Sequence, residues 1–265
     1  MVKACIPATA CAFAALMLCA GAASAEIKTQ TFDYKQGDTV LEGFIAWDDA
    51  KTGKLPGILV FPQWTGPSEH ERNAARELAK LGYVAMVADV YGKGIHPTPP
   101  KESGAEMGKY MKDRALLRAR VKAGFDRLAS DSHVDAAKIA TIGYCFGGAS
   151  VLELGRQGAE VKAIVSFHGS LSNPTPADAK NIKAPVLVLH GADDPVVPAA
   201  EVEAFKAEMK DAKIDMQFVA YSGTVHSFTQ PEAGNDNSKG AAYNAQSAKR
   251  SWAAMQAFLK ETLGQ

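Results

Sequence analysis

Short apolar runs alternate with helical stretches along most of this chain, and the alternation restricts its possible folds more than any other feature. Runs typical of strands occupy residues 57–61, 84–89, 138–142, 161–167, 185–190 and 214–221. Helical patterns occupy a stretch that ends near Ser130 and residues 68–81, 147–157, 199–212 and 240–262. Continuously apolar strands separated by helices are typical of a parallel sheet that helices cover on both faces. The sequence therefore predicts an α/β fold with a mostly parallel central sheet.

Local signals mark several boundaries of these elements. Residues 27–35 and 40–47 are predicted to form a β-hairpin. Ser68, with Glu71 three residues later, has the pattern of a capping box, which favours the start of a helix. Residues 92–104 are rich in proline and glycine, so this segment is predicted to be irregular.

The first 25 residues have the layout of a secretory signal peptide. Lys3 precedes an apolar run over residues 10–20, and Ala23-Ser24-Ala25 matches a small-residue cleavage site. A membrane anchor is disfavoured because the run is short for a bilayer. A lipid on Cys19 is disfavoured because no small residue precedes it. We predict a signal peptide over residues 1–25, one domain over residues 26–265, and secretion to a periplasm.

The composition is close to neutral and excludes strongly basic or acidic classes of protein. Removing Lys3 with the signal peptide leaves 28 basic residues (29 − 1) against 29 acidic ones. This balance argues against nucleic acid as a partner, and after cleavage no membrane association is expected. We expect a monomer that acts on a small molecule. No metal-ligand spacing or phosphate-binding loop is present, so no metal or other cofactor is expected.

Cleavage would leave Cys145 as the single cysteine, because the other three lie in the first 25 residues. A lone cysteine has no disulfide partner within its chain, and many free cysteines are only small buried side chains. Cys145, however, lies between a predicted strand and a predicted helix, with Gly143 and Gly147 two residues away on either side. That arrangement is typical of a nucleophile elbow, where small residues let the strand and helix approach closely.

A nucleophilic cysteine requires a base and a group that orients the base. The run 185–190 leads into an acidic turn with Asp193 and Asp194, and the run 214–221 precedes a loop with His226. Nucleophile, acid and histidine follow in this order in α/β-hydrolases, so all three would leave the same edge of the sheet. Asp194 is favoured as the acid because it directly precedes the turn at residues 195–198, whereas Asp193, as a turn residue, could cap its own loop.

The mature chain resembles the dienelactone hydrolase family, a branch of the α/β-hydrolases with a cysteine nucleophile, over nearly its whole length. The motifs that carry this resemblance are GYCFGG (143–148), GADDPVVP (191–198), VHSF (225–228), VYGKG (90–94) and AYNAQSAKRSW (242–252). The resemblance implies an α/β-hydrolase fold with Cys145 as nucleophile, His226 as base and Asp194 as its orienting acid. It also implies an oxyanion hole formed by the backbone N–H groups of Phe146 and Trp64.

Three positions depart from the members of this family that cleave dienelactone. Gln63 replaces a glutamate that pairs with the cysteine, and Lys93 and Gln230 replace two arginines that hold the substrate carboxylate. Lys93 keeps a charge but loses the bidentate fork, whereas Gln230 has no charge. These departures leave dienelactone itself open as the substrate.

Several further residues are candidates for the walls of the substrate pocket. Aromatic side chains near the predicted motifs indicate a partly aromatic pocket, although such residues also commonly belong to the core. His190 ends a buried strand and is predicted to be structural. The pocket candidates are Gln63, Tyr91, Lys93, Tyr144, His168 and Ser227.

Two functions of different classes fit these residues. The first is hydrolysis of small carboxylic esters or lactones through a Cys-His-Asp triad and a thioester acyl-enzyme, as in carboxymethylenebutenolidases. The second is a binding or redox-sensing protein on a hydrolase fold that uses Cys145 as a sensor. A sensor needs no histidine and aspartate at the same sheet edge, so the hydrolase is favoured.

Overall fold

The computed structural model describes residues 1–4 and 26–264, and within them one sheet of eight strands forms the centre. The strands are β1 (Ile27–Gln36), β2 (Thr39–Asp48), β3 (Leu55–Phe61), β4 (Val84–Val87), β5 (Val134–Tyr144), β6 (Ala163–Phe167), β7 (Val186–Gly191) and β8 (Met216–Tyr221). They lie in the order β1-β2-β4-β3-β5-β6-β7-β8. β1 with β2 and β2 with β4 are antiparallel, and all other neighbours are parallel. The predicted α/β fold is confirmed.

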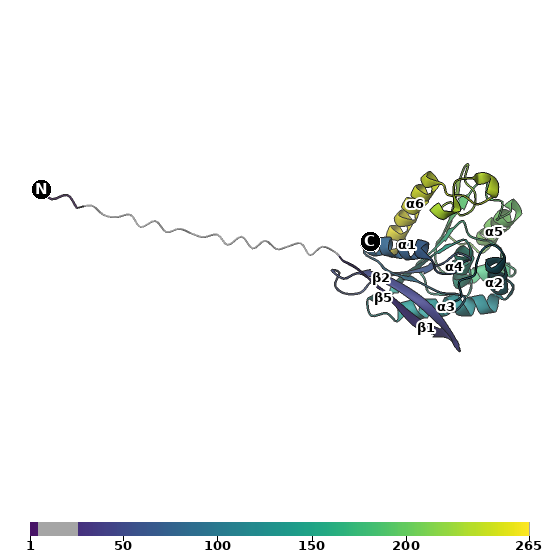
Figure 1. Cartoon of the computed structure of the whole chain (residues 1–265), viewed down its shortest axis with the longest axis horizontal. Helices are drawn as coiled ribbons and strands as arrows, with labels where there is room; N and C mark the ends of the chain where they lie inside the picture. Colours follow the sequence, from purple (N-terminus) through teal and green to yellow (C-terminus); the bar gives the residue numbers. More distant parts are fainter. Residues whose placement is uncertain (5–25, 265) are drawn as a thin grey trace.

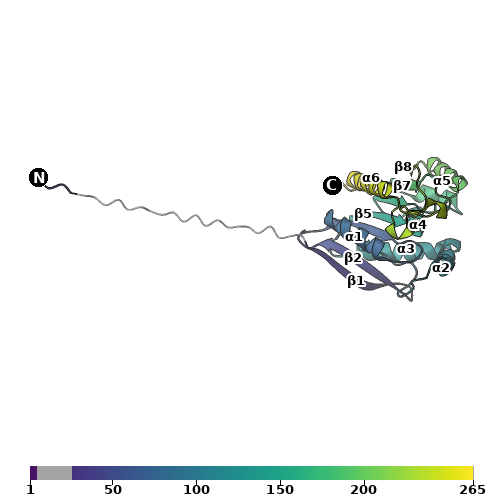
Figure 2. The same ribbon diagram turned by 45° about the horizontal axis from the view of Figure 1, so that its top comes forward.

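Helices cover both faces of this sheet (Figures 1 and 2). They are α1 (Glu69–Lys80), α2 (Lys101–Lys112), α3 (Arg114–Ala129), α4 (Phe146–Arg156), α5 (Ala199–Asp211) and α6 (Ala245–Leu263). The buried side chains of α1 and α6 join one hydrophobic cluster, and those of α3, α4 and α5 join the other. Three short 3₁₀ turns lie at Pro176–Asn181, Pro231–Ala233 and Asn237–Lys239. The predicted signal peptide falls largely on residues 5–25, outside the described residues.

The start of α1 follows the predicted capping box. The Ser68 hydroxyl accepts a hydrogen bond from the N–H of His70 at 3.2 Å, and the Glu71 carboxylate accepts one from the Ser68 N–H at 2.9 Å. Leu78 and the alanines beside it bury one face of the helix against the sheet. The prediction for this helix is confirmed within one residue at each end.

The helix expected to end near Ser130 is two helices, α2 and α3. Asp113 separates them with φ −109° and ψ 85°, and its side chain accepts a hydrogen bond from the N–H of Leu116. An aspartate that caps a helix start favours this break. The break at Asp113 therefore divides the predicted helix into two separate helices.

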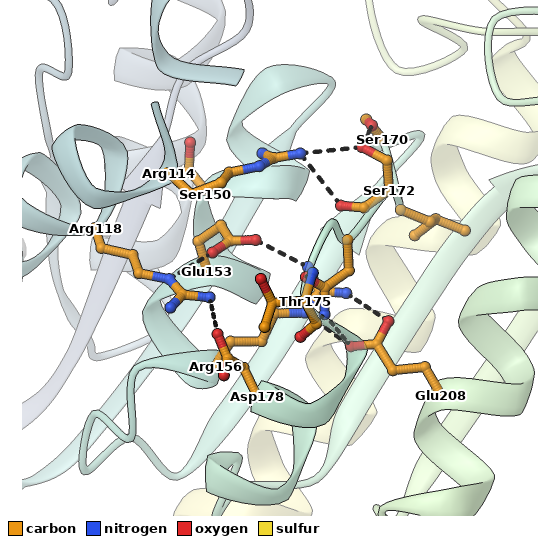
Figure 3. A network of polar contacts seen from close by, with 12 residues as sticks. Arg114, Arg118, Ser150, Glu153, Arg156, Ser170, Ser172, Thr175, Asp178 and Glu208 are labelled. Carbon is orange, nitrogen blue, oxygen red and sulfur yellow. Dashed lines mark hydrogen bonds and ion pairs between the residues drawn. The ribbon is translucent and has the colours of Figure 1, made fainter. Parts of the chain in front are cut away.

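A network of buried charges holds α4 against its neighbours (Figure 3). Arg156 on α4 donates two hydrogen bonds of 2.9 Å to the carboxylate of Glu208 on α5. Glu153, also on α4, accepts from Arg118 on α3 at 2.7 Å and from Arg156 at 3.2 Å. Arg118 also pairs with Asp178 at 2.7 Å. The helix that follows Cys145 is therefore fixed to α3, to α5 and to the turn at Pro176–Asn181.

Within the part of the chain that the structure describes, no helix combines the length and apolar character needed to cross a membrane.

Candidate active site

Cys145 lies at the turn from β5 into α4, as the N-cap residue of that helix. Its backbone has φ 55° and ψ −111°, a conformation that strains a residue with a side chain. A Cβ atom on Gly143 would lie 2.0 Å from the carbonyl oxygen of Gly147, and one on Gly147 would lie 2.2 Å from that of Phe61. Close backbone approach therefore requires both glycines, and the turn presents the half-buried Cys145 beyond the carboxyl end of β5.

Asp194 and His226 form a buried pair beside this turn. The Asp194 Oδ2 atom accepts a hydrogen bond from His226 Nδ1 at 2.8 Å. Asp194 Oδ1 accepts from the backbone N–H groups of Val196 and Val197 at 2.8 and 3.3 Å, which fixes the carboxylate. The neighbouring Asp193 is exposed, so the histidine pairs with the second aspartate of the turn.

Backbone hydrogen bonds also fix the loop that carries His226. The His226 N–H donates to the carbonyl of Gly240 at 3.2 Å, and the His226 carbonyl accepts from the N–H of Ala242 at 3.0 Å. The imidazole is buried, and its Nε2 atom has no aligned hydrogen-bond partner among the described residues. With Nδ1 held by the aspartate, Nε2 remains available for proton transfer.

The charge balance around His226 favours its protonated form. Burial alone would lower the pKa of His226, but the negative charge of Cys145 and the hydrogen bond with Asp194 raise this pKa to about 10. An imidazole that lies between the side chains of Asp194 and Cys145 is suited to holding and returning a proton.

Trp64 and Phe146, the two residues predicted to form an oxyanion hole, both line the cavity that contains Cys145. Phe146 is the first residue of α4, so its N–H has no partner within the helix. Trp64 follows β3, and among the described residues neither of these N–H groups donates to another backbone carbonyl. Tyr91 supports both residues from behind, because its hydroxyl donates to the Trp64 carbonyl at 2.9 Å and its ring stacks on Phe146.

A cavity of about 340 Å³ opens in front of Cys145. This volume lies near the lower end of the roughly 300–1,000 Å³ that is typical of small-molecule sites. Its lining residues are Trp64, Met107, Met111, Cys145, Phe146, Ser170, Val196, His226, Ser227 and Ala241. Among the described residues, no group of three or more His, Cys, Asp or Glu side chains is placed to hold a metal ion.

Of the six pocket candidates, Ser227 lies in the cavity wall and the other five do not. Lys93 is half-exposed and pairs with Asp33 at 2.7 Å, so its charge is directed elsewhere. Tyr144 is buried on the opposite face of the sheet, where it stacks on Phe167. Neither residue therefore lines this cavity.

The remaining candidates also lie outside the cavity lining. The Gln63 N–H is 3.5 Å from the Glu71 carboxylate, and Tyr91 supports the wall as described above. His168 is fully buried, its Nε2 lies 2.9 Å from the Thr229 hydroxyl, and its ring contacts that of His226 edge to face. Burial, with the charge of His226 beside it, lowers the pKa of His168 well below its ordinary value. His168 is thus a neutral ring that packs against His226.

Sequence reasoning missed five residues of the cavity wall: Met107, Met111, Ser170, Val196 and Ala241. Met107 and Met111 are four residues apart on α2, which places them on one face of that helix. That spacing was visible in the sequence, but it resembles ordinary core packing. Only the folded structure identifies the cavity as the surface that this face contacts.

The chain as a whole resembles several known proteins in sequence and fold. The sequence pattern of the dienelactone hydrolase family matches residues 41–263. A Yersinia pestis protein named as a candidate carboxymethylenebutenolidase is 29% identical over 234 residues, which cover 83% of each chain. A solved structure of a dienelactone hydrolase-like promiscuous phosphotriesterase from metagenomic libraries is 40% identical, with a TM-score of 0.86 over 90% of this chain and 99% of that one. A structure named as a candidate dienelactone hydrolase from Klebsiella pneumoniae shares the fold, with a TM-score of 0.75 and 24% identity over 88% and 98% of the two chains.

Proposed function

Because this chain belongs to the dienelactone hydrolase family and is a hydrolase, we propose that it cleaves small carboxylic esters or lactones with Cys145, His226 and Asp194. One observation carries the proposal. The strained Cys145 and His226 line the same cavity from two strand ends, and Asp194, after a third strand, is hydrogen-bonded to His226. A cysteine that served only as a packed side chain would need neither the strained backbone nor this pair.

The first half of the reaction transfers the acyl group to sulfur. The Cys145 thiolate attacks the carbonyl carbon, and the backbone N–H groups of Phe146 and Trp64 stabilise the oxyanion that forms. When the intermediate collapses, the C–O bond to the alcohol breaks. His226 gives the departing oxygen its Nε2 proton, leaving a thioester on Cys145.

The second half releases the acid. His226, now neutral at Nε2, takes a proton from water, and the resulting hydroxide attacks the thioester carbonyl. The same two N–H groups stabilise the second oxyanion, and its collapse expels the Cys145 thiolate. The carboxylic acid leaves and the thiolate–imidazolium pair is restored. Asp194 holds the ring in one orientation throughout.

Replacement of Cys145 by alanine tests this proposal. We expect no hydrolysis of p-nitrophenyl acetate by Cys145→Ala above the rate without enzyme, while its circular dichroism spectrum matches that of the parent protein. If the folded variant keeps its turnover, Cys145 is not the nucleophile. Loss of turnover also argues against the sensor alternative, which predicts no ester hydrolysis by the parent protein.

A second candidate activity is hydrolysis of phosphotriesters. It is favoured by the 40% identity to the promiscuous phosphotriesterase and by a cavity wall without a lysine or arginine, since phosphotriesters are neutral. Release of p-nitrophenol from paraoxon by the parent protein, and its loss in Cys145→Ala, would support a shared site. No release above background would exclude the activity.

We also propose that residues 1–25 are removed on secretion. The support is the charged start, the apolar run and the Ala23-Ser24-Ala25 site. After expression of the full chain in a bacterium with a periplasm, mass spectrometry of the periplasmic fraction should give Glu26 as the first residue. An intact N-terminus in the cytoplasmic fraction would contradict this proposal.

A further inference from the structure

The cavity wall around Cys145 is almost entirely neutral. Apart from Cys145 and His226, its residues are apolar side chains, with two serines. An unpaired carboxylate that moves from water into such surroundings loses its hydration, which is strongly unfavourable unless a cation or several hydrogen-bond donors meet it. A substrate with a second charged group therefore needs a cation close to this wall.

Neither Lys93 nor Arg114 is available to meet a carboxylate in this cavity. Lys93 pairs with Asp33 at the surface. Arg114 lies behind the wall, where it donates to the Ser172 carbonyl and hydroxyl at 3.3 and 3.1 Å and contacts the Met111 sulfur at 3.0 Å. Gln230, in the second arginine position of the family resemblance, is neutral and buried. None of these residues contributes to the wall of the cavity.

A carboxylate also lies directly behind the wall. Glu201 on α5 accepts hydrogen bonds from the Ser170 hydroxyl at 3.2 Å and from the Leu171 N–H at 2.6 Å. The hydroxyls of Ser170 and Ser172 lie 3.2 Å apart, and Arg114 on α3 donates a hydrogen bond to that of Ser172 (Figure 3). The two charges of opposite sign offset each other, so this end of the cavity offers an anion no net attraction.

The α2 helix supplies the adaptable part of the wall. Met107 and Met111 are one helical turn apart, so both side chains reach the cavity from one face. Methionine is unbranched and polarizable, and it fills irregular apolar space around different partners. An apolar acyl chain would find matching surroundings here, whereas a carboxylate would lose its hydration without gaining an ion pair.

We propose that this site selects neutral esters with an apolar acyl chain and that Met107 and Met111 determine this selectivity. The proposal rests on the proposed ester hydrolysis and adds the class of acyl group to it. The same selectivity disfavours lactones that carry a carboxylate as substrates.

Two p-nitrophenyl esters of similar size test the selectivity. The hexanoate is neutral, and the glutarate monoester has a carboxylate at the end of its acyl chain. We expect kcat/KM for the hexanoate to exceed that for the glutarate by about 100-fold or more. Equal values, or a preference for the glutarate, would overturn the proposal.

A charge placed on α2 should change this ratio. Met107→Arg should lower kcat/KM for the hexanoate and raise it for the glutarate by roughly tenfold, because the guanidinium can pair with the carboxylate. Gly108→Arg is the matched control, since Gly108 lies outside the cavity wall and has open space for a Cβ. The control should keep the parent ratio. The same ratio in Met107→Arg as in the control would show that α2 does not determine the selectivity.

A measurement without turnover separates this proposal from the proposed function. Hexanamide and glutaramic acid, the amides that correspond to the two esters, are tested for protection of Cys145 against iodoacetamide. Hexanamide should slow alkylation at concentrations where glutaramate has no effect. If no ester is hydrolysed but this pattern appears, ester hydrolysis fails while the selectivity of the cavity holds. Equal protection by both amides would overturn the selectivity even if esters are hydrolysed.

Discussion

At the scale of single residues, the site depends on which atom of each side chain is occupied. Asp194 uses both carboxylate oxygens, one toward His226 and one toward the N–H groups of its own turn. His226 uses Nδ1 and leaves Nε2 without an aligned partner. The order of the residues along the chain predicted Cys145, Asp194 and His226. Only the fold shows that Asp194, and not Asp193, contacts His226.

The two aspartates of the turn provide a matched pair of variants. Asp194→Asn should lower kcat by about three to four orders of magnitude, because an amide can hold the ring in the wrong tautomer and cannot stabilise the imidazolium. Asp193→Asn, at the exposed neighbour, should stay close to the parent rate. Steady-state kinetics with p-nitrophenyl acetate measures both. The reverse order of effects would assign the acid to Asp193.

The raised pKa of His226 provides a second test at this scale. The charge of Cys145 contributes to the rise, so Cys145→Ala should lower the pKa of His226 from about 10 toward its ordinary value. In the parent protein the ring should therefore stay protonated from neutral pH to about pH 9. In the variant it should lose its proton at a lower pH. NMR titration of the labelled imidazole gives both values, and identical titrations would contradict a charge interaction between the two residues.

At the scale of elements, the turn between β5 and α4 is the most constrained part of the molecule. Its glycine pattern identified it from sequence, because few other structures need small residues on both sides of a cysteine. The wall contributed by α2 could not be predicted in the same way. It depends on the break at Asp113, and an aspartate within a helical pattern is also common on exposed helix surfaces.

The glycines of the turn lead to a prediction about stability. Gly147→Ala should destabilise the fold by several kcal/mol, because its Cβ would lie 2.2 Å from a backbone oxygen that cannot move away. Gly108→Ala on α2 has open space and should stabilise by up to about 1 kcal/mol. Urea denaturation gives the free energy of unfolding of each variant. A Gly147→Ala protein as stable as the parent would show that the turn can relax.

At the scale of the whole molecule, α4 links the site to the buried network of charges shown in Figure 3. The sequence predicted the layers of the fold, since these follow from apolar strands and helix patterns. It did not predict this network, because Glu153, Arg156 and Glu208 belong to helices whose charges would ordinarily be exposed. The same limit applies to Lys93 and Tyr144. A motif places them near the site in sequence, but Tyr144 is buried on the other face of the sheet and Lys93, in a turn, pairs with Asp33.

Breaking this network should destabilise the whole molecule. Arg156→Met leaves the buried carboxylates of Glu153 and Glu208 without their shared partner, and we expect a loss of about 3–5 kcal/mol. Lys122→Met removes one member of a half-exposed pair with Asp126 and should change the free energy of unfolding little. Urea denaturation compares the two variants. Equal effects would show that the buried network contributes no more than a surface ion pair.

The central claim is that Cys145 carries the acyl group during turnover. Parent protein mixed with p-nitrophenyl acetate, quenched in acid within the first turnovers and digested, should yield the peptide of Cys145 with one added acetyl group. The modification should disappear as substrate is exhausted, because water attacks the thioester. Turnover without acetyl at Cys145 at any quench time, or an acetyl group on another residue that appears and disappears at the catalytic rate, would contradict the account.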